Sequence, residues 1–411
     1  SMTMESGNIS AVRETPDSNG QYGVGVTDGG DFTMTGGKIE AGWFAVAGNG
    51  NYKTQNSIIN ITDGELISTA DYAVYLPQSG TTTISGGKVY GAAGGVCIQR
   101  GTLNVEGTAL ITSKGTGSTG NWGDGTGGLD CAAINVSGAY GIATVNIKGG
   151  TLIAEAKSLI TEGTTYTPVI NVTGGTFSDP SVLKYMVTNA TVDIKLLSNI
   201  NIAKTELATG YILNAANATA NLNLNGHDII NSSETADATP FTQIFTVQNG
   251  TLNISGNGNV KCDASATAKD DGYRMVIEAR GYGTVNIHGG SYYNTQKLNT
   301  QIDLIYAREN GKINIYGGTF ESGKYGTPNN DTDGRYWVLN LKNTDKNTAS
   351  IQVSGGTFIN FNPANPNMDD NESYLVTGYE VTRDGSVYTA AHKVGDGRKE
   401  YIVGQTSQEN R

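Results

Sequence analysis

The sequence predicts an all-β protein, and more narrowly a right-handed parallel β-helix made of two consecutive units. A short motif recurs along the chain, in which apolar and polar residues alternate before a Gly-Gly pair and a further apolar residue. The alternation has the period of two that is typical of strands, and no segment has a convincing helical period. Glycine contributes 57 of 411 residues and charged residues only 16%, which suits a thin core with many tight corners.

The recurring motif sets the length of the repeat. In order along the chain, the first residue of the Gly pair, or its replacement, is Gly36, Asp63, Gly86, Gly107, Gly149, Gly174, Gly226, Gly256, Gly289, Gly317 and Gly355. Subtraction gives steps of 27, 23, 21, 42 and 25 up to Gly174, and of 30, 33, 28 and 38 from Gly226. Periods of about 20–50 residues indicate a stacked repeat array. We interpret the step of 42 as two short repeats, with the missing copy near residues 131–138.

A second strand precedes each copy, as in YAVYLPQSG, IFTVQNG and LIYARENG. Two or three short strands per repeat, joined by Gly corners, would stack as coils about 4.8 Å apart, with their apolar side chains in inward columns. β-Propeller blades also repeat strands, but with a more regular period of about 40–45 residues. The shorter steps therefore favour a β-helix.

The copies TTISGGKV and INIYGGTF resemble the repeats of β-helical proteins of bacterial cell surfaces and phage fibres in the broad pectate-lyase-like superfamily. The resemblance covers nearly the whole chain. It implies the β-helical architecture and a location on a bacterial surface, outside the cell or on a virion. It implies no activity, because the Gly pair is a corner and not a site.

The repeat stops twice in the same way, where GGTF is followed by proline and a tyrosine-containing segment. We therefore predict one β-helical unit over residues 1–187 and a second over 188–394, followed by a polar tail at 395–411. The dipeptide Asp384-Gly385 predicts a hairpin turn. A hairpin at the end of the second unit would cover strand edges that are otherwise open.

Charge and composition limit the classes of binding partner that we expect for this chain. The formal net charge is −11, and without a basic cluster we expect no nucleic-acid binding. No apolar run reaches about 18 residues, so we expect no membrane insertion. Cys97, Cys131 and Cys262 are scattered and predict neither a disulfide framework nor a metal pair. Because Ser1 and Met2 lead straight into a strand, we interpret the chain as a segment of a longer precursor, and its oligomeric state stays open.

One polar residue of each copy is expected to lie in an outward column, since it alternates with inward apolar residues. Such a column is either a flat hydrogen-bonding face for a glycan or a solvated ladder. Its expected members are Thr33, Asn60, Thr83, Asn104, Asn146, Asn171, Asn223, Asn253, Asn286, Asn314 and Gln352.

A second column carries positive charge. Aligning VIEARG, LIYARE and VLNLKN stacks Arg280, Arg308 and Lys342, with an adjacent outward column of Glu278, Tyr306 and Asn340. Positive charges about 4.8 Å apart repel one another unless a negatively charged group lies close to them. That group is either an acidic ligand, such as a uronic or sialic acid, or a carboxylate of Glu278, Glu309 or Asp345.

Aromatic residues in long insertions are further candidates, because aromatic rings can pack against sugar faces and because function concentrates in loops. Trp122 lies in a Gly-rich insertion at 113–130, which we expect to project from its coil. Tyr336 and Trp337 border a second insertion at 325–337. For Trp337, packing in the core or a cap is the alternative.

The second insertion contains NNDTDG, which places Asn329, Asp331 and Asp333 at alternate positions before a glycine. This pattern resembles the start of a calcium loop, although the twelfth position is Asn340 instead of glutamate. An ordinary polar turn is the alternative. We expect no cofactor other than such a calcium ion.

Catalytic motifs are weak. Pectate-lyase-like enzymes typically carry a basic residue near calcium-binding carboxylates, and polygalacturonase-like ones carry NTD, DD and GHG segments. Here NTD at 343–345 follows DD at 270–271, and GHD at 226–228 stands in place of GHG, so the order departs from that family. Glu278 and Asp303 are the candidates for a carboxylate pair of a glycosidase.

We expect a non-catalytic, adhesin-like module that recognises a glycan or another cell-surface ligand on an exposed coil face or through the two insertions. One alternative is a lyase or glycoside hydrolase that acts on an acidic polysaccharide. The other is a structural spacer or a segment of a phage tail fibre.

Overall fold

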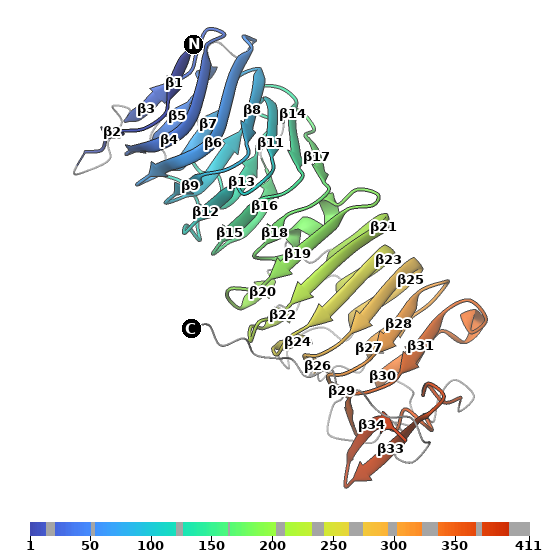
Figure 1. The fold of residues 1–411 in the computed structure, drawn as a ribbon. Coiled ribbons are helices and arrows are strands. Elements are labelled where there is room, and N and C mark those ends of the chain that lie inside the picture. Colours follow the sequence, from blue (N-terminus) through green and yellow to red (C-terminus); the bar gives the residue numbers. More distant parts are fainter. Residues whose placement is uncertain are drawn as a thin grey trace.

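The structure is a computed structural model that describes residues 1–13, 21–50, 54–120, 126–162, 165–202, 210–231, 242–262, 274–294, 302–322, 336–366 and 372–393. The molecule is elongated, with its strands stacked in chain order from one end to the other (Figure 1). Almost all regular elements are strands, and the pairs between successive repeats are parallel. The predicted all-β fold with long parallel sheets is confirmed.

The largest sheet has 20 strands among the described residues. In the first half of the chain they are β1 (Met2–Met4), β2 (Asn8–Ala11), β4 (Asp31–Ala41), β6 (Ser57–Ser68), β8 (Gly80–Ile84), β9 (Lys88–Gly91), β11 (Gly101–Val105), β12 (Leu110–Ser113), β14 (Ala143–Ile147), β15 (Thr151–Ala154), β17 (Val169–Val172) and β18 (Thr176–Phe177). In the second half they are β19 (Thr191–Lys195), β21 (Tyr211–Asn223), β23 (Thr242–Ser255), β25 (Arg274–Ile287), β27 (Ile302–Ala307), β28 (Lys312–Ile315), β30 (Tyr336–Leu341) and β31 (Ser350–Val353).

Two smaller sheets complete the wall of the molecule, one in each half. The six-stranded sheet comprises β3 (Tyr22–Gly25), β5 (Phe44–Ala47), β7 (Tyr72–Leu76), β10 (Gly94–Ile98), β13 (Ala132–Val136) and β16 (Lys157–Thr161). The eight-stranded sheet comprises β20 (Ile200–Ile202), β22 (Ile229–Asn231), β24 (Asn259–Cys262), β26 (Ser291–Asn294), β29 (Thr319–Ser322), β32 (Thr357–Ile359), β33 (Tyr379–Asp384) and β34 (Val387–His392). Two short 3-10 helices are η2 (Pro180–Tyr185) and η3 (Asn343–Asp345).

The Gly pairs turn the chain between neighbouring strands, as the sequence predicts. Gly87 has φ +72°, a conformation that glycine adopts without strain. A Cβ atom on Gly86 would lie 2.2 Å from the carbonyl oxygen of Thr62 in the preceding repeat. Glycine is therefore required here both for the corner and for the close approach of successive repeats.

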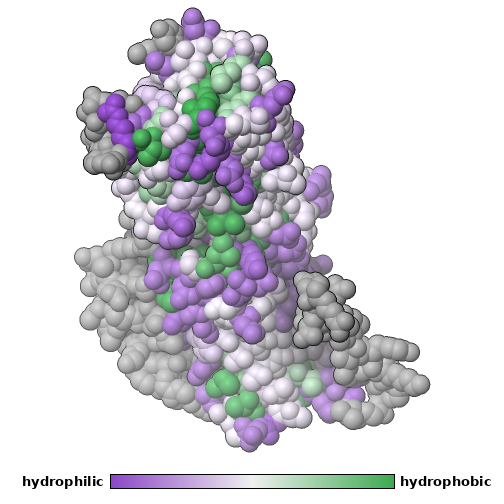
Figure 2. All heavy atoms as spheres, turned by 60° about the vertical axis from the view of Figure 1, so that its left-hand side comes forward, coloured by the Kyte–Doolittle hydropathy of each residue, from purple (hydrophilic) through white to green (hydrophobic). Residues whose placement is uncertain are grey.

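The interior follows the alternation in the sequence. In β14, the side chains of Val145 and Ile147 are fully buried, whereas Asn146 between them is partly exposed. Most of the buried apolar side chains in the described residues form one cluster that extends along the chain. In the second half this core includes an aromatic stack of Tyr292, Phe320 and Phe358, with successive ring centroids 5.0 Å apart. On the side drawn in Figure 2 the surface is mainly hydrophilic, with apolar residues in small separate areas.

The step of 42 residues is a single repeat, which corrects the expected missing copy near 131–138. Strand β11 pairs directly with β14, and β12 pairs with β15. Residues 132–136 form β13 in the six-stranded sheet. The extra length is an insertion between β12 and β13, which periodicity alone could not distinguish from a degenerate repeat.

The pairing of strands changes at the junction of the two halves. In the first half, strands that precede Gly pairs stack on one another, and strands that follow Gly pairs do the same. At the junction β18, which follows the pair Gly174–Gly175, pairs with β19. Strand β19 in turn pairs with residues 219–223 of β21, which lead toward Gly226. In the second half, the strands that lead into Gly positions therefore continue the row of strands that follow Gly pairs in the first half.

The large sheet is continuous through the predicted boundary at 187/188, while the six-stranded sheet ends at β16 and the eight-stranded one begins at β20. The division into independent units at 1–187 and 188–394 stays a prediction. At the far end β33 and β34 form an antiparallel hairpin, and β34 pairs with β32. The predicted tail at 395–411 lies outside the described residues.

Candidate functional site

The predicted cation column comprises Arg280 within β25, Arg308 directly after β27 and Lys342 directly after β30. The register places Glu278, Tyr306 and Asn340 opposite one another on these strands, as the alignment predicts. Arg280 and Arg308 approach the carboxylate of Glu278. The structure therefore brings this set of predicted residues together.

Glu278 is buried, which corrects the expected outward, solvated column. Its side chain is only 3% exposed. One carboxylate oxygen, Oε1, accepts a hydrogen bond from Arg308 Nε at 2.6 Å, and the other, Oε2, accepts one from Gln243 Nε2 at 3.1 Å. Arg280 Nε lies 3.9 Å from Oε2. Alternation indicated the outward direction, but it carries no information about what packs over that side of the sheet.

The other interactions of the positively charged side chains are also ion pairs with carboxylates of this chain. Arg308 pairs with Glu309 through Nη1, and Lys342 Nζ lies 3.5 Å from Asp345 Oδ2. The Glu309 backbone N–H donates to that same Asp345 oxygen at 2.6 Å. This N–H, with the Thr344 hydroxyl and then Lys342, lowers the pKa of Asp345.

We call Glu278, Arg308, Glu309, Lys342 and Asp345 the ion-pair cluster. Of the two partners that the sequence left open for the cations, carboxylates of the chain are the ones observed. A ligand-binding role for Arg280, Arg308, Lys342 and Tyr306 stays a prediction.

Asp303, the other candidate acid, is also buried, with 3% exposure. Its Oδ1 accepts a hydrogen bond from Asn340 Nδ2 at 2.9 Å. Burial, with the nearby charge of Asp303, raises the pKa of Tyr306 to about 12. Both candidate carboxylates are thus engaged in buried hydrogen bonds.

Several candidates lie outside what the structure describes. They are Trp122, the side chain of Tyr336, and the calcium candidates Asn329, Asp331 and Asp333. Trp337 lies in β30 opposite Asp303 and is half-buried. Within the described ranges, no three His, Cys, Asp or Glu side chains are grouped closely enough to hold a metal ion.

The described ends of the first insertion fold back onto the six-stranded sheet, although we expected this insertion to project. Leu129 packs against a separate apolar cluster on the outer side of that sheet. The Thr126 hydroxyl donates to Asp71 Oδ2 at 2.9 Å, and the Tyr72 hydroxyl donates to the Asp130 carbonyl oxygen. The contacts of Thr126 and Asp130 with β7 and its flank could not be read from the order of residues.

The expected polar column forms two hydrogen-bonded ladders. In the first half, Asn146 Nδ2 donates to Asn104 Oδ1 at 3.0 Å, and Asn171 donates to Asn146 at 2.9 Å. In the second half each asparagine also donates to the residue one repeat earlier, at 2.8–2.9 Å, in the order Asn314, Asn286, Asn253, Asn221 and Asp193. Both ladders lie on strands that lead into a Gly position. Because β18 pairs with β19 at the junction, the second ladder continues the row of strands that follow Gly pairs in the first half.

Asn221, and not the predicted Asn223, belongs to this ladder. Asn221 is opposite Asn253, while Asn223 is opposite Ser255. The corner before Gly226 is two residues longer than in the copy used for the alignment, so counting back from the glycine selected the wrong asparagine.

We name the outward side of β19, residues 219–223 of β21, residues 249–255 of β23, residues 282–287 of β25, β28 and β31 the open face. Its inward neighbours Leu252 and Ile254 are fully buried, whereas Asn253 is partly exposed. At its border His288 and Tyr316 stack with ring centroids 4.7 Å apart and ring planes inclined by 10°. Tyr316 is 50% exposed.

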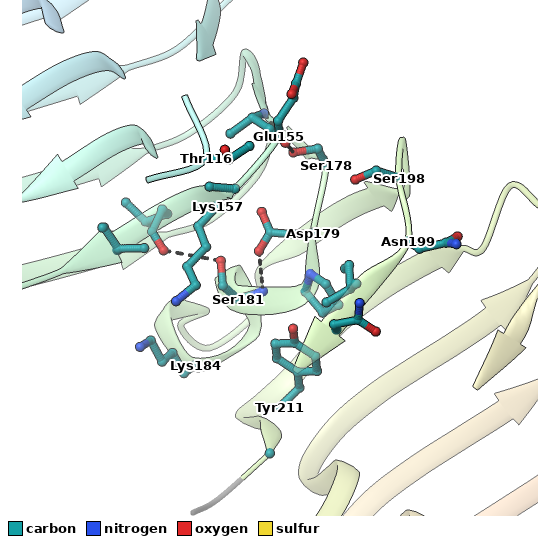
Figure 3. A pocket seen from close by; sticks show the side chains of 18 of the residues that line it. Thr116, Glu155, Lys157, Ser178, Asp179, Ser181, Lys184, Ser198, Asn199 and Tyr211 are labelled. Carbon is teal, nitrogen blue, oxygen red and sulfur yellow. Dashed lines mark hydrogen bonds between the residues drawn. The ribbon is translucent and has the colours of Figure 1, made fainter. Parts of the chain in front are cut away.

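A cavity of about 550 Å³ lies at the junction, and sequence reasoning missed it. We call it the junction cavity. Its walls come from residues 154–161, 178–184, 198–201 and 210–212, with Thr116 at one side (Figure 3). The interruption of the repeat near 186–190 was the available signal, because a break in a stack of strands leaves space that no regular repeat fills.

Local sequence shapes one wall of this cavity. Asp179 caps η2, and Pro180 follows as its first residue, an arrangement that favours a helix start. Asp179 Oδ1 accepts from Ser181 N at 2.9 Å, and Oδ2 accepts from Ser158 N at 2.6 Å. One buried carboxylate thereby ties η2 to β16.

Comparison with protein-family models, with curated proteins and with solved structures found no match to this chain. Among the described residues, no helix has the length and apolar character needed to cross a membrane.

Proposed function

We propose that this chain is a right-handed parallel β-helix that serves as an extracellular, non-catalytic recognition module, and that it binds a neutral polysaccharide on the open face. The β-helix is supported by the parallel pairing of each strand with the corresponding strand one repeat later. Right-handedness is supported by the strong preference for that hand in parallel strand crossovers. The extracellular location rests on the resemblance of the repeats.

The second asparagine ladder is the observation that carries the binding proposal. An amide group has two N–H donors and two acceptor lone pairs. The ladder uses one donor and one acceptor of Asn253 and of Asn286. The others can face the hydroxyl groups of a sugar, which both donate and accept hydrogen bonds.

The chemistry of this face favours a neutral ligand. From β21 to β25 its outward described side chains are Thr, Asn and Ser together with the exposed Tyr282, and none of them carries a charge. The stacked pair of His288 and Tyr316 adds exposed ring surface at the border, and aromatic side chains combine an apolar ring face with polar groups. A sugar chain that crosses several strands could contact both.

A binding role is favoured over catalysis by the state of the two candidate acids. Glu278 and Asp303 are 2% and 3% exposed and are engaged by Arg308 and Asn340 respectively. A glycosidase needs one carboxyl group that can give up a proton and another that can reach the sugar or a water molecule. Neither carboxylate has that accessibility.

The test is binding of the whole chain to an array of polysaccharides, followed by affinity measurements on any neutral one that binds. Asn253→Leu with Asn286→Leu, and separately Tyr316→Ala, should each weaken binding by about tenfold or more. Asn146→Leu in the first ladder and Tyr166→Ala, at a tyrosine that is 48% exposed and lies outside the open face, are the matched controls.

Absence of binding to every polysaccharide would favour the spacer or fibre alternative. Release of reducing ends or unsaturated products from an acidic polysaccharide, abolished by Glu278→Gln, would favour the enzyme and overturn the proposal.

A further inference from the structure

Three neighbouring strands of the open face, β21, β23 and β25, carry the same pair of outward side chains (Figure 1). In chain order, the pairs are Thr219 with Asn221, Thr251 with Asn253, and Thr284 with Asn286. The register places the threonines opposite one another, and the asparagines likewise. The residue between the two members of each pair is buried in the core, so both members face outward. We call these six residues the Thr–Asn grid.

The grid repeats at the spacing of the strands. Neighbouring strands are about 4.8 Å apart, and residues two positions apart along a parallel strand are about 6.6 Å apart. Each asparagine of the grid donates from Nδ2 to the residue one repeat earlier and accepts from the residue one repeat later, so the three amides have the same orientation. Each amide keeps one N–H and one lone pair outside the ladder.

The threonines add a second row of polar groups beside these amides. Their side chains are partly exposed, and within the described residues no hydrogen bond engages their hydroxyl groups. A hydroxyl both donates and accepts hydrogen bonds. Every strand of the grid therefore presents the same two groups, a hydroxyl and an amide, at the same separation.

The grid carries no charge and ends at a charged residue on either side. Asp193 on β19 lies opposite Asn221, and Lys312 on β28 lies opposite Thr284. In the first half the same pair occurs on only two successive strands, β11 and β14, because Val169 lies opposite Thr144 on the next strand. Among the described strands of the large sheet, three successive copies occur only in the second half.

Exposed aromatic rings border both rows of the grid. Tyr282, which is 74% exposed, precedes Thr284 by two residues on β25. On the side of the asparagines, His288 follows Asn286 by two residues and stacks on Tyr316. Rings that combine an apolar face with a polar group, beside rows of amides and hydroxyls, favour a sugar as the ligand.

We propose that the Thr–Asn grid binds an extended neutral polysaccharide that runs across β21, β23 and β25, with one sugar on each strand. This inference rests on the function proposed above, and it names the class of polysaccharide and the direction of the chain. Where sugars are joined through equatorial bonds, each sugar advances the chain by roughly the distance between neighbouring strands. The hydroxyls on one edge of each ring would face a threonine, and those on the other edge an asparagine. A coiled polysaccharide such as amylose would bend away from the grid.

Titration calorimetry of the whole chain with cello- and manno-oligosaccharides of two to six sugars tests the proposal. Malto-oligosaccharides of the same lengths represent the coiled class. We expect at least one extended series to bind, with an affinity that rises about fivefold or more from two sugars to three, because a further threonine and asparagine are engaged. The affinity should then level off, and the malto-oligosaccharides should bind about tenfold more weakly or not at all.

Thr251→Val removes one hydroxyl group of the grid and keeps the shape of the side chain. It should weaken binding of the trisaccharide by about fivefold. Thr144→Val is the matched control, because Thr144 precedes Asn146 on β14 as Thr251 precedes Asn253 on β23, and it should leave binding unchanged. Thermal melting checks that both variants fold.

An affinity that does not depend on length, equal binding of the malto-oligosaccharides, or unchanged binding by Thr251→Val would each overturn this inference. Failure of both extended series would also overturn it. If a neutral polysaccharide still bound the chain and Asn253→Leu with Asn286→Leu weakened that binding, the function proposed above would stand without the extended chain. Absence of binding to every polysaccharide would overturn both.

Discussion

The two halves of the molecule differ in the side chains that lie on the outer side of corresponding strands. In each half, the strand that leads into an asparagine-bearing strand directs side chains three residues apart to its outer side. In β5, β7 and β10 of the first half these positions are free of charge, and with Trp43 they form the aromatic cover of Phe44, Ala47, Tyr72, Tyr75 and Cys97. The same columns end on the polar residues Asn135 in β13 and Lys157 in β16. In the second half the corresponding positions hold Glu278, Asp303, Tyr306 and Asn340, together with Met275 and Trp337.

The inner sides of these same strands do not differ. Val74 and Leu76 in β7 belong to the core, as do Ile277 and Ala279 in β25. The difference shows that the repeat constrains the interior and the corners, while the outer side accepts either aromatic packing or a network of charges. Phe44 and Tyr75 stack with centroids 4.7 Å apart, whereas Glu278 depends on Arg308 and Gln243.

Removing a ring from the aromatic cover should have the largest effect. Phe44 is fully buried, so Phe44→Ala should lower the free energy of unfolding by about 3–5 kcal/mol. Urea denaturation followed by circular dichroism measures this. Ile58→Ala, at a side chain that is 48% exposed, is the control. A loss below about 1 kcal/mol would mean that the cover adds little to the stability of the first half.

Breaking the ion-pair cluster should have a smaller effect. Glu278→Ala leaves Arg308 with Glu309, which is partly exposed, so we expect a loss of about 1–3 kcal/mol in the same assay. The double variant Glu278→Leu with Arg308→Leu sharpens the comparison, because apolar residues often replace a buried ion pair without loss. Recovery in the double variant would show that packing can substitute for charge here, as the first half suggests. A double variant no better than the single one would show that this surface requires its charges.

The titration of Tyr306 tests the environment of the second half directly. Its pKa is raised to about 12 in the folded chain, against about 10 in an unfolded one. The neutral phenol therefore stabilises the fold fully below pH about 10, and this contribution is lost as the pH rises through about 12. Ultraviolet absorbance of the phenolate, compared with Tyr306→Phe, isolates this titration. A difference spectrum that appears near pH 10 would contradict the buried site.

Removing an exposed ion pair should have the smallest effect on the free energy of unfolding. Lys88 Nζ lies 3.0 Å from Glu65 Oε1, and their side chains are 64% and 43% exposed. Lys88→Ala should change the free energy of unfolding by less than about 1 kcal/mol, because solvent and salt screen such pairs. A larger loss would show that charge pairs on this molecule are stronger than their exposure implies. The expected difference between Glu278 and Lys88 would then lose its basis.

The candidate sites were predictable to different degrees. Stacking of Glu278, Tyr306 and Asn340 followed from aligning three short segments, because parallel repeats keep their register. The burial of Glu278 and Asn340 did not follow, since it depends on segments far away in the sequence. The junction cavity was not predictable at all, because residues from β16, η2 and β20 meet there only through the displaced pairing.

The amino-acid sequence alone determined the strands, the glycine corners and the inward and outward columns. These depend on alternation and on backbone conformations that neighbouring residues dictate. The tertiary structure decided the displacement at β18 and β19, the fold-back of the described ends of the 113–130 insertion and the burial of Glu278. Each of these depends on which distant segments pack against one another, and a local pattern of residues does not encode that choice.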